Sequence, residues 1–217
     1  KTKPTQHSVR ELREIGIQPD VIVCRCKELL SKDIKRKIAL FCDVAPEGVI
    51  TSVDAKSIYD LPLQLEKENM DKVVISRLGM RNRKTNLNSW KRFVNTIHNK
   101  SLPIITVALV GKYTSLSDSY ISVVEALKHA SAANKTQVII KFVDSEVLEK
   151  KGFQKTFKDV SGILVPGGFG DRGVEGKIMA AKYAREKKIP YLGLCLGMHV
   201  ASIEFARNVL GLDDAHS

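Results

Sequence analysis

Short apolar runs alternate with amphipathic stretches in the first part of the chain. Residues 21–24 and 48–53 are apolar runs of strand length, and the segment 33–41 between them has helical periodicity. Continuous apolar runs are typical of strands that are buried on both faces of a parallel sheet, with helices covering the faces. The pattern therefore predicts an α/β unit with a parallel sheet.

A short helix is predicted ahead of the first strand. Ser8 and Glu11 have the spacing of a capping box, in which the two side chains satisfy backbone N–H groups of the first helical turn. This pattern places the start of the helix at Ser8 and its end near Ile15. The first seven residues would then precede the helix.

A polar and basic segment, 81–103, interrupts the pattern and contains one amphipathic helix around Trp90 and Phe93. We expect it to be a linker between a first domain, 1–80, and a second domain, 104–217. The second domain repeats the alternation, with strands expected at 106–112, 138–143, 162–166 and 190–195. Asp118 is expected to N-cap the helix after the first of these strands. The predicted fold class is α/β, with two parallel-sheet units.

One cysteine occupies a context that favours chemistry. The run Gly193-Leu194-Cys195-Leu196-Gly197 joins a predicted strand to a predicted helix and has the Gly-x-nucleophile-x-Gly pattern of a nucleophile elbow. A sulfur at the N-terminus of a helix is favoured as thiolate by the helix dipole, and it is placed to attack an acyl carbon. A buried structural cysteine in a glycine-rich turn is the alternative interpretation.

A second glycine-rich segment, 166–170, has the sequence Pro-Gly-Gly-Phe-Gly and ends the neighbouring strand. Glycine lets backbone N–H groups approach a substrate closely, and a developing oxyanion needs such donors. A plain loop would explain this segment by itself. The loop and the cysteine elbow together, in this order and at this separation, resemble the class I glutamine amidotransferases, which have a flavodoxin-like fold.

This resemblance implies that Cys195 attacks the carboxamide of glutamine to form a thioester and release ammonia. Gly168 and Phe169 correspond to the loop that forms the oxyanion hole. The segment that lines the glutamine pocket corresponds to Leu196, Gly197, Met198 and His199.

Two departures from the family pattern qualify these roles. The family usually has glutamine at the position of His199, which leaves the affinity for glutamine, or its pH dependence, open. The histidine and glutamate partners of the family's cysteine come later than the 22 residues that follow Cys195 here. We therefore expect the chain by itself to hydrolyse glutamine poorly.

The first eight residues, Lys-Thr-Lys-Pro-Thr-Gln-His-Ser, combine two lysines with hydroxyl groups. Lysines and helix N–H groups form anion sites, although a frayed basic terminus would have the same composition. The string resembles the nucleotide-binding motif of CTP synthases, and the resemblance extends over essentially all 217 residues. It implies a Rossmann-like amidoligase portion followed by the amidotransferase portion.

In CTP synthases ATP phosphorylates O4 of UTP, and ammonia from glutamine displaces the phosphate. The resemblance implies that UTP, or CTP as feedback inhibitor, is bound by Lys1, Thr2, Lys3, Pro4, Thr5, Gln6 and Lys37. It implies that ATP is contacted by Val53, Asp54 and Ala55. It also implies Mg²⁺ with ligands outside this chain, GTP as allosteric activator, and a homotetramer that can form filaments. No metal ligand is assigned within the chain.

The net charge of +11 favours acidic partners. Because there is no arginine-rich arm and no interleaving of aromatic and basic residues, phosphorylated small molecules are favoured over nucleic acid. No apolar run approaches the roughly 18 residues that span a bilayer, so no membrane association is expected.

The four cysteines have neither Cys-x-x-Cys nor zinc-site spacing. Cys24 and Cys42 are expected to be small buried residues. The protein is expected to be cytoplasmic. The abrupt first and last residues indicate part of a longer protein. Two other interpretations remain at this point: another class I amidotransferase, and a non-catalytic assembly or regulatory fragment.

Overall fold

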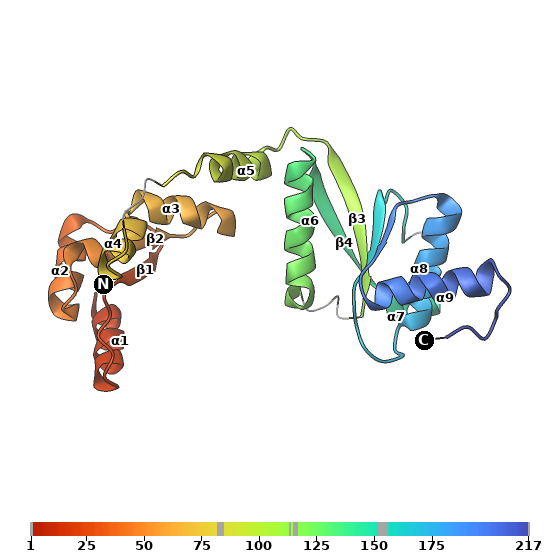
Figure 1. Cartoon of the computed structure of the whole chain (residues 1–217), viewed down its shortest axis with the longest axis horizontal. Coiled ribbons are helices and arrows are strands. Elements are labelled where there is room, and N and C mark those ends of the chain that lie inside the picture. Colours follow the sequence, from red (N-terminus) through yellow and green to blue (C-terminus); the bar gives the residue numbers. More distant parts are fainter. Residues whose placement is uncertain (1, 82–84, 113, 115–116, 152–155, 217) are drawn as a thin grey trace. The chain divides into compact units, whose positions relative to one another are not determined.

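The computed structural model describes residues 2–81, 85–112, 114, 117–151 and 156–216. The chain divides into two compact units, Lys1–Val94 and Asn95–Ser217 (Figure 1). Each unit contains a sheet of parallel strands together with helices, as the apolar pattern predicts. The division falls inside the predicted linker, 81–103. The assignment of the first domain to an amidoligase and of the second to an amidotransferase stays a prediction.

The first unit is built on two parallel strands. β1 (Ile22–Cys26) pairs with β2 (Val49–Val53), and Ile22 lies opposite Val49. Two short 3₁₀ turns, Pro46–Gly48 and Ile58–Asp60, flank β2. The helices are α1 (Lys3–Glu14), α2 (Lys32–Cys42), α3 (Leu61–Lys67), α4 (Met70–Arg77) and α5 (Asn88–His98), the last of which continues into the second unit.

Helix α2 shows why the predicted elements form. Ser31 caps its N-terminus by accepting a hydrogen bond from the Ile34 N–H at 3.3 Å, and Asp43 ends it in the left-handed conformation. Its apolar face packs with α1 and both strands in a core of Val9, Ile22, Ile38, Ala39, Cys42, Val44 and Val49. Cys42 is fully buried as predicted, whereas Cys24 is only half-buried.

The start of α1 differs from the prediction. The helix begins at Lys3, five residues before the expected position, with Thr2 at its N-cap. The Gln6 amide donates to the Thr2 hydroxyl at 3.1 Å, and Pro4 lies in the first turn, where a missing N–H costs nothing. The capping box predicted for Ser8 is therefore wrong, because Ser8 lies within the helix. The string at residues 2–8 forms the first turns of α1 instead of preceding it.

An ion pair between Lys35 of α2 and Glu68 connects α2 to the segment after α3. Glu68 also accepts a hydrogen bond from the Thr51 N–H at 2.8 Å, and both charged side chains are mostly buried. Burial raises the pKa of Glu68, but the bonds from Lys35 and Thr51 outweigh it, so its pKa lies below the ordinary value of 4.5. Such a carboxylate stabilises the fold above that value and loses its contribution as the pH falls through the folded-state pKa.

We expect Glu68→Gln to lower the free energy of unfolding of this unit at pH 7 by about 1–3 kcal/mol, because it leaves the Lys35 ammonium without its charge partner. The loss of stability below pH 4.5 should also become shallower. Urea unfolding measured from pH 3 to pH 7 tests both effects. Glu28→Gln, at an exposed position, is the matched control, and equal behaviour of the two variants would contradict the assignment.

The second unit contains a four-stranded parallel sheet with the order β4-β3-β5-β6. The strands are β3 (Ile104–Gly111), β4 (Gln137–Asp144), β5 (Gly162–Val165) and β6 (Tyr191–Gly193). All four predicted strands are present. The helices are α6 (Ile121–Ala133), α7 (Ser145–Lys151), α8 (Val174–Lys187) and α9 (Leu196–Asn208), and Figure 1 shows α6 on one side of the sheet with α8 and α9 on the other.

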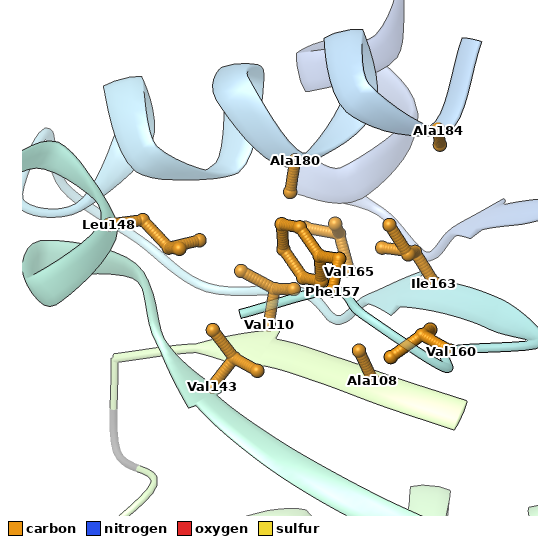
Figure 2. Packing of buried hydrophobic residues seen from close by; sticks show 10 residues of the cluster. All are labelled: Ala108, Val110, Val143, Leu148, Phe157, Val160, Ile163, Val165, Ala180 and Ala184. Carbon is orange, nitrogen blue, oxygen red and sulfur yellow. The ribbon is translucent and has the colours of Figure 1, made fainter. Parts of the chain in front are cut away.

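Both faces of this sheet are covered, which explains the continuous apolar runs. Ala108 and Val110 of β3 face the core under α8, whereas Leu109 between them packs towards α6 with Tyr120 and Leu164. Figure 2 shows the larger core, in which Phe157 lies among short aliphatic side chains. Its members are Ala108, Val110, Val143, Leu148, Phe157, Val160, Ile163, Val165, Ala180 and Ala184.

Two local predictions in this unit are wrong. Asp118 does not cap α6; it lies in a 3₁₀ turn, Ser117–Tyr120, so that the helix starts three residues later with Tyr120 at the N-cap. The helical spacing of Leu196, Val200, Ile203, Ala206 and Leu210 predicts a helix that stops at Gly211, but α9 ends at Asn208 and Leu210 is 61% exposed. Helical periodicity therefore extends beyond the helix that forms.

Candidate active site

Cys195 lies between the end of β6 and the start of α9. It occupies the N-cap position of α9 with φ 53° and ψ −110°, and its side chain is exposed. A residue with a Cβ rarely adopts positive φ, and such strain persists only where the surrounding structure enforces it. The strand–turn–helix junction predicted from the glycine spacing is therefore present, with the strain that a nucleophile elbow requires.

Backbone hydrogen bonds hold the elbow in this conformation. The Leu194 N–H donates to the Val165 carbonyl at 2.9 Å, which ties the turn to β5. The Met198 N–H donates to the Cys195 carbonyl at 2.9 Å, and the Tyr191 hydroxyl donates to the Gly197 carbonyl at 2.7 Å. Burial raises the pKa of that Tyr191 hydroxyl, so it stays a donor.

The glycine loop at 166–170 lies directly beside the cysteine. A Cβ placed on Gly167 would be 3.4 Å from the Cys195 Cβ and 3.9 Å from its Sγ. The two segments meet because β5 and β6 are parallel neighbours, so that their carboxyl ends lie at one edge of the sheet. The first N–H groups of a helix lack intrahelical acceptors, and that of Leu196 directly follows the nucleophile, where elbow enzymes place an oxyanion donor.

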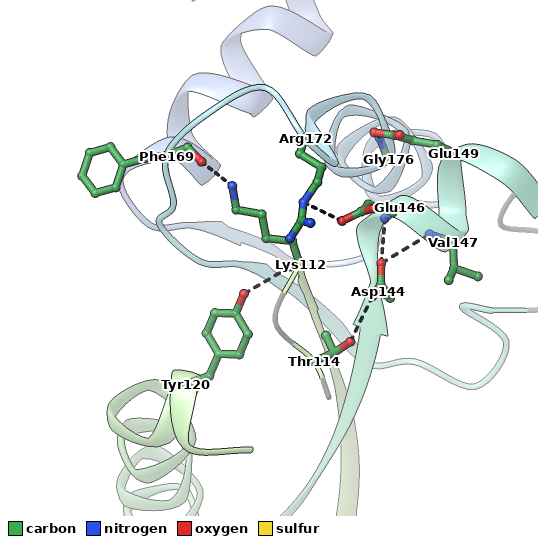
Figure 3. Close-up of polar contacts among 10 residues, drawn as sticks. All are labelled: Lys112, Thr114, Tyr120, Asp144, Glu146, Val147, Glu149, Phe169, Arg172 and Gly176. Carbon is green, nitrogen blue, oxygen red and sulfur yellow. Dashed lines mark hydrogen bonds and ion pairs between the residues drawn. The ribbon is translucent and has the colours of Figure 1, made fainter. Parts of the chain in front are cut away.

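Charged side chains support this loop from neighbouring elements (Figure 3). The Lys112 ammonium, one residue after β3, donates to the Phe169 carbonyl. Arg172 pairs with Glu146 of α7, with 2.9 Å between Nε and Oε1. The Asp144 carboxylate accepts a hydrogen bond from the Glu146 N–H at 2.8 Å and so caps α7. The loop is therefore anchored at Phe169, and the turn that follows it is anchored at Arg172.

Lys177 is a buried cation beside the same loop. It belongs to the first turns of α8 and is 1% exposed, and a Cβ on Gly168 would lie 3.6 Å from its Nζ. Burial, with a smaller contribution from Lys112, lowers the pKa of this ammonium. Sequence reasoning assigned no role to either lysine. The position of Lys112, at the carboxyl end of a strand in the same sheet as β6, is the signal that could have identified it.

The other predicted residues of this site lie around the cysteine. Phe169 is 91% exposed, and Leu196 is half-buried with its Cδ2 3.9 Å from a Cβ placed on Gly168. Gly197 is buried against β5, where a Cβ would lie 2.1 Å from the Val165 carbonyl oxygen. Met198 and His199 are exposed on the first turn of α9.

The predicted nucleotide residues all belong to the first unit. Lys1 is outside the described residues, and Thr2, Lys3, Pro4, Thr5 and Gln6 occupy the cap and first turn of α1. Lys3 and Gln6 line a hollow of about 600 Å³ between α1 and Phe41 of α2. Arg10 and Arg13, which sequence reasoning did not select, line it as well.

Lys37 and the predicted ATP residues are found elsewhere in this unit. Lys37 is exposed on α2 and is not part of that hollow's described lining. Val53 is the last residue of β2, and Asp54 and Ala55 follow it. Asp54 pairs with Arg25 of β1 at 3.3 Å between Oδ1 and Nε, in an exposed position where such pairs contribute little to stability.

Within the described part of the chain, no group of three or more histidine, cysteine, aspartate or glutamate side chains is arranged to hold a metal ion. None of the helices there combines the length and apolar character needed to cross a bilayer.

Each unit contains a segment that matches a known protein family. Residues 115–216 match the family described as glutamine amidotransferase class-I, and residues 1–80 match the family described as CTP synthase N-terminus. The match to the class I glutamine amidotransferases thus lies within the second unit, Asn95–Ser217. The whole chain aligns with curated CTP synthases, at 56% identity over 217 residues with that of Carboxydothermus hydrogenoformans and 53% with that of Bacillus subtilis.

The chain belongs to the CTP synthase family, and it spans 40% of the length of these two relatives. Among solved structures, the glutaminase domain of Trypanosoma brucei CTPS with bound acivicin is 46% identical. That match covers 52% of this chain and 44% of the other, with a TM-score of 0.49.

Proposed function

We propose that this chain is the central part of a CTP synthase, which converts UTP to CTP with ATP and with ammonia released from glutamine. The observation that carries the proposal is the strained Cys195 elbow beside the glycine loop at 166–170, in a chain whose residues 1–80 also match the CTP synthase N-terminus family. Another class I amidotransferase would share the elbow and lack the first unit.

In this proposal the Cys195 thiolate attacks the carboxamide carbon of glutamine. The carbonyl oxygen becomes an oxyanion, which the Leu196 N–H and the backbone of residues 168–169 stabilise. The carbon–nitrogen bond then breaks with proton transfer to nitrogen, so that ammonia leaves and a thioester remains for water to hydrolyse. The histidine and glutamate that move these protons are expected C-terminal to Ser217.

The nucleotide sites belong to the first unit in this proposal. Lys3, Arg10 and Arg13 line the hollow beside α1 together with one acidic residue, Glu14, so a net positive charge remains for the triphosphate of UTP or CTP. The Gln6 amide offers a neutral donor. The predicted UTP residues are Lys1, Thr2, Lys3, Pro4, Thr5, Gln6 and Lys37. ATP is assigned to the turn of Val53, Asp54 and Ala55.

Family membership alone supports the remaining parts of the proposal. They are a Mg²⁺ ion with the ATP, activation by GTP, a homotetramer that can form filaments, and a cytoplasmic location. The described residues offer no carboxylate cluster that fits Mg²⁺, so we assign no step of the reaction to this metal within the chain.

The proposal is tested by measuring CTP formation from UTP and ATP by the full-length protein, with glutamine and separately with ammonia. We expect CTP with both nitrogen donors. A protein that hydrolyses glutamine but makes CTP from neither donor would be another class I amidotransferase. A protein that neither hydrolyses glutamine nor makes CTP, and whose Cys195 does not react with a glutamine-derived chloroketone, would be a non-catalytic assembly fragment.

His199 gives a separate prediction about substrate affinity. We expect His199→Gln, which introduces the usual family residue on the exposed first turn of α9, to lower the KM for glutamine about 2- to 10-fold, the value of one hydrogen bond. Steady-state kinetics with glutamine measure the effect. The KM for ammonia is the internal control and should not change. An unchanged or higher KM for glutamine would show that His199 already binds the substrate as well as the usual family residue does.

A further inference from the structure

Lys112 connects the end of β3 to the glycine loop. Its ammonium donates to the Phe169 carbonyl, and its backbone N–H donates to the Tyr120 hydroxyl at 3.2 Å (Figure 3). The side chain is half-buried, and its Cε would lie 4.0 Å from a Cβ placed on Gly168. A single long side chain therefore reaches from one strand end across to the middle of the loop.

The loop needs such a contact because glycine flanks Phe169 on both sides. Glycine adopts many backbone conformations at little cost, and Gly170 has φ +77°, a region that other residues rarely enter. The peptide units on either side of Phe169 can therefore rotate unless something outside the loop holds them. The exposed phenyl ring, at 91%, has few contacts that could do so.

The direction of these peptide units decides the electrostatics next to Cys195. An N–H group directed at the developing oxyanion stabilises it, whereas a carbonyl oxygen in the same place repels it. Holding the Phe169 carbonyl at Lys112 keeps that oxygen bound to a cation. It also fixes the loop next to Gly167, where an added Cβ would contact the cysteine.

We propose that Lys112 is a positioning residue of the glutaminase reaction: its ammonium holds the Phe169 carbonyl and thereby fixes the loop at 167–170 in the conformation that stabilises the oxyanion. The inference rests on the proposed function of Cys195. Lys112 acts through the loop backbone and does not touch the substrate.

Lys141 provides a matched control. It is a β4 lysine of the same unit whose ammonium also donates to a backbone carbonyl, that of Thr156, at 2.6 Å. Lys141→Met therefore removes the same kind of contact at a position outside the glycine loop. Lys112→Arg retains a cationic donor, whereas Lys112→Met retains only the apolar length of the side chain.

The test uses the full-length protein and compares glutamine hydrolysis with ammonia-dependent CTP formation. We expect Lys112→Met to lower kcat for glutamine about 10- to 100-fold, with KM changed less than about threefold, because the loss affects the transition state more than glutamine binding. Lys112→Arg should recover most of kcat. Lys141→Met and the ammonia reaction should stay within about twofold of the parent protein.

Labelling of Cys195 distinguishes positioning from general damage. A glutamine-derived chloroketone passes through a tetrahedral oxyanion, whereas iodoacetamide reacts by direct displacement at carbon. We expect Lys112→Met to slow the chloroketone about 10-fold and leave iodoacetamide unchanged. Unchanged kcat in Lys112→Met, or equal slowing of both reagents, would overturn the inference. A parent protein that the chloroketone does not label would instead overturn the proposed function.

Should Lys112→Met fail to fold, Lys112→Gln keeps a hydrogen-bond donor and removes the charge. It should then fold and show a lower kcat for glutamine than Lys112→Arg, with the same selectivity between the two reagents. Equal kcat in these two variants would count against the role of the ammonium.

Discussion

Cys195→Ala is expected to reduce glutamine-dependent CTP formation by at least about 1,000-fold while leaving the ammonia-dependent reaction within about twofold. The thiolate makes the only covalent bond to glutamine in the proposed reaction, so no partial function survives its removal. Ammonia added from solution bypasses that step. Parallel assays with the two nitrogen donors measure the effect directly.

Cys26→Ala is the matched control for this prediction. Cys26 is a half-buried thiol at the end of β1 in the first unit, and its removal should change neither reaction. Equal loss with both nitrogen donors in Cys195→Ala would mean that the elbow supports the fold and performs no chemistry. Retention of glutamine-dependent synthesis would remove Cys195 from the mechanism altogether.

Alanine at Gly197 is expected to disrupt the second unit. The new Cβ would lie 2.1 Å from the Val165 carbonyl oxygen, and a Cβ on Gly193 would lie 2.4 Å from the backbone of Gly197. These are backbone atoms of β5 and α9 that cannot move aside as a flexible side chain can. We expect a loss of at least about 3 kcal/mol in the free energy of unfolding, with exposure of the β5 and β6 amides to hydrogen exchange.

Gly162→Ala separates this effect from the general cost of replacing glycine. Its Cβ would lie 3.7 Å from the Pro190 carbonyl oxygen and 3.9 Å from Val107, which is ordinary contact. Its stability should stay within about 1 kcal/mol of the parent protein. Similar unfolding of Gly162→Ala and Gly197→Ala would show that the close approach at the elbow does not decide stability.

The strands were predictable because both faces of the second sheet are covered, so that the apolar runs are continuous and differ from any helical pattern. The helix starts were harder to predict, because competing local signals occur within a few residues. At α1 the proline-containing first turn outweighs the Ser8 capping box, and at α6 a 3₁₀ turn takes Asp118 out of the capping position. Local hydrogen-bonding signals in the sequence do not decide which of two competing helix starts forms, because tertiary packing also contributes to the choice.

At the site, the nearness of the cysteine to the glycine loop followed from the order of the strands alone, since parallel neighbours end at one edge. The two lysines could not be identified in this way. Lysine side chains are almost always exposed, yet Lys177 is buried. The contact of Lys112 with Phe169 joins residues that are 57 positions apart in the chain. Contacts made by long side chains between elements depend on details of packing that periodicity does not contain.

The four thiols differ in their access to reagents. Cys42 is buried, Cys24 and Cys26 are half-buried, and burial raises the pKa of Cys24 and of Cys42, which keeps both in the unreactive thiol form at neutral pH. Cys195 alone is exposed. It lies on a strained turn that backbone hydrogen bonds hold against β5 and α9. A mild alkylating dye should therefore mark this one position in the chain without any prior mutation, which makes the elbow a natural attachment point for covalent fragment screening.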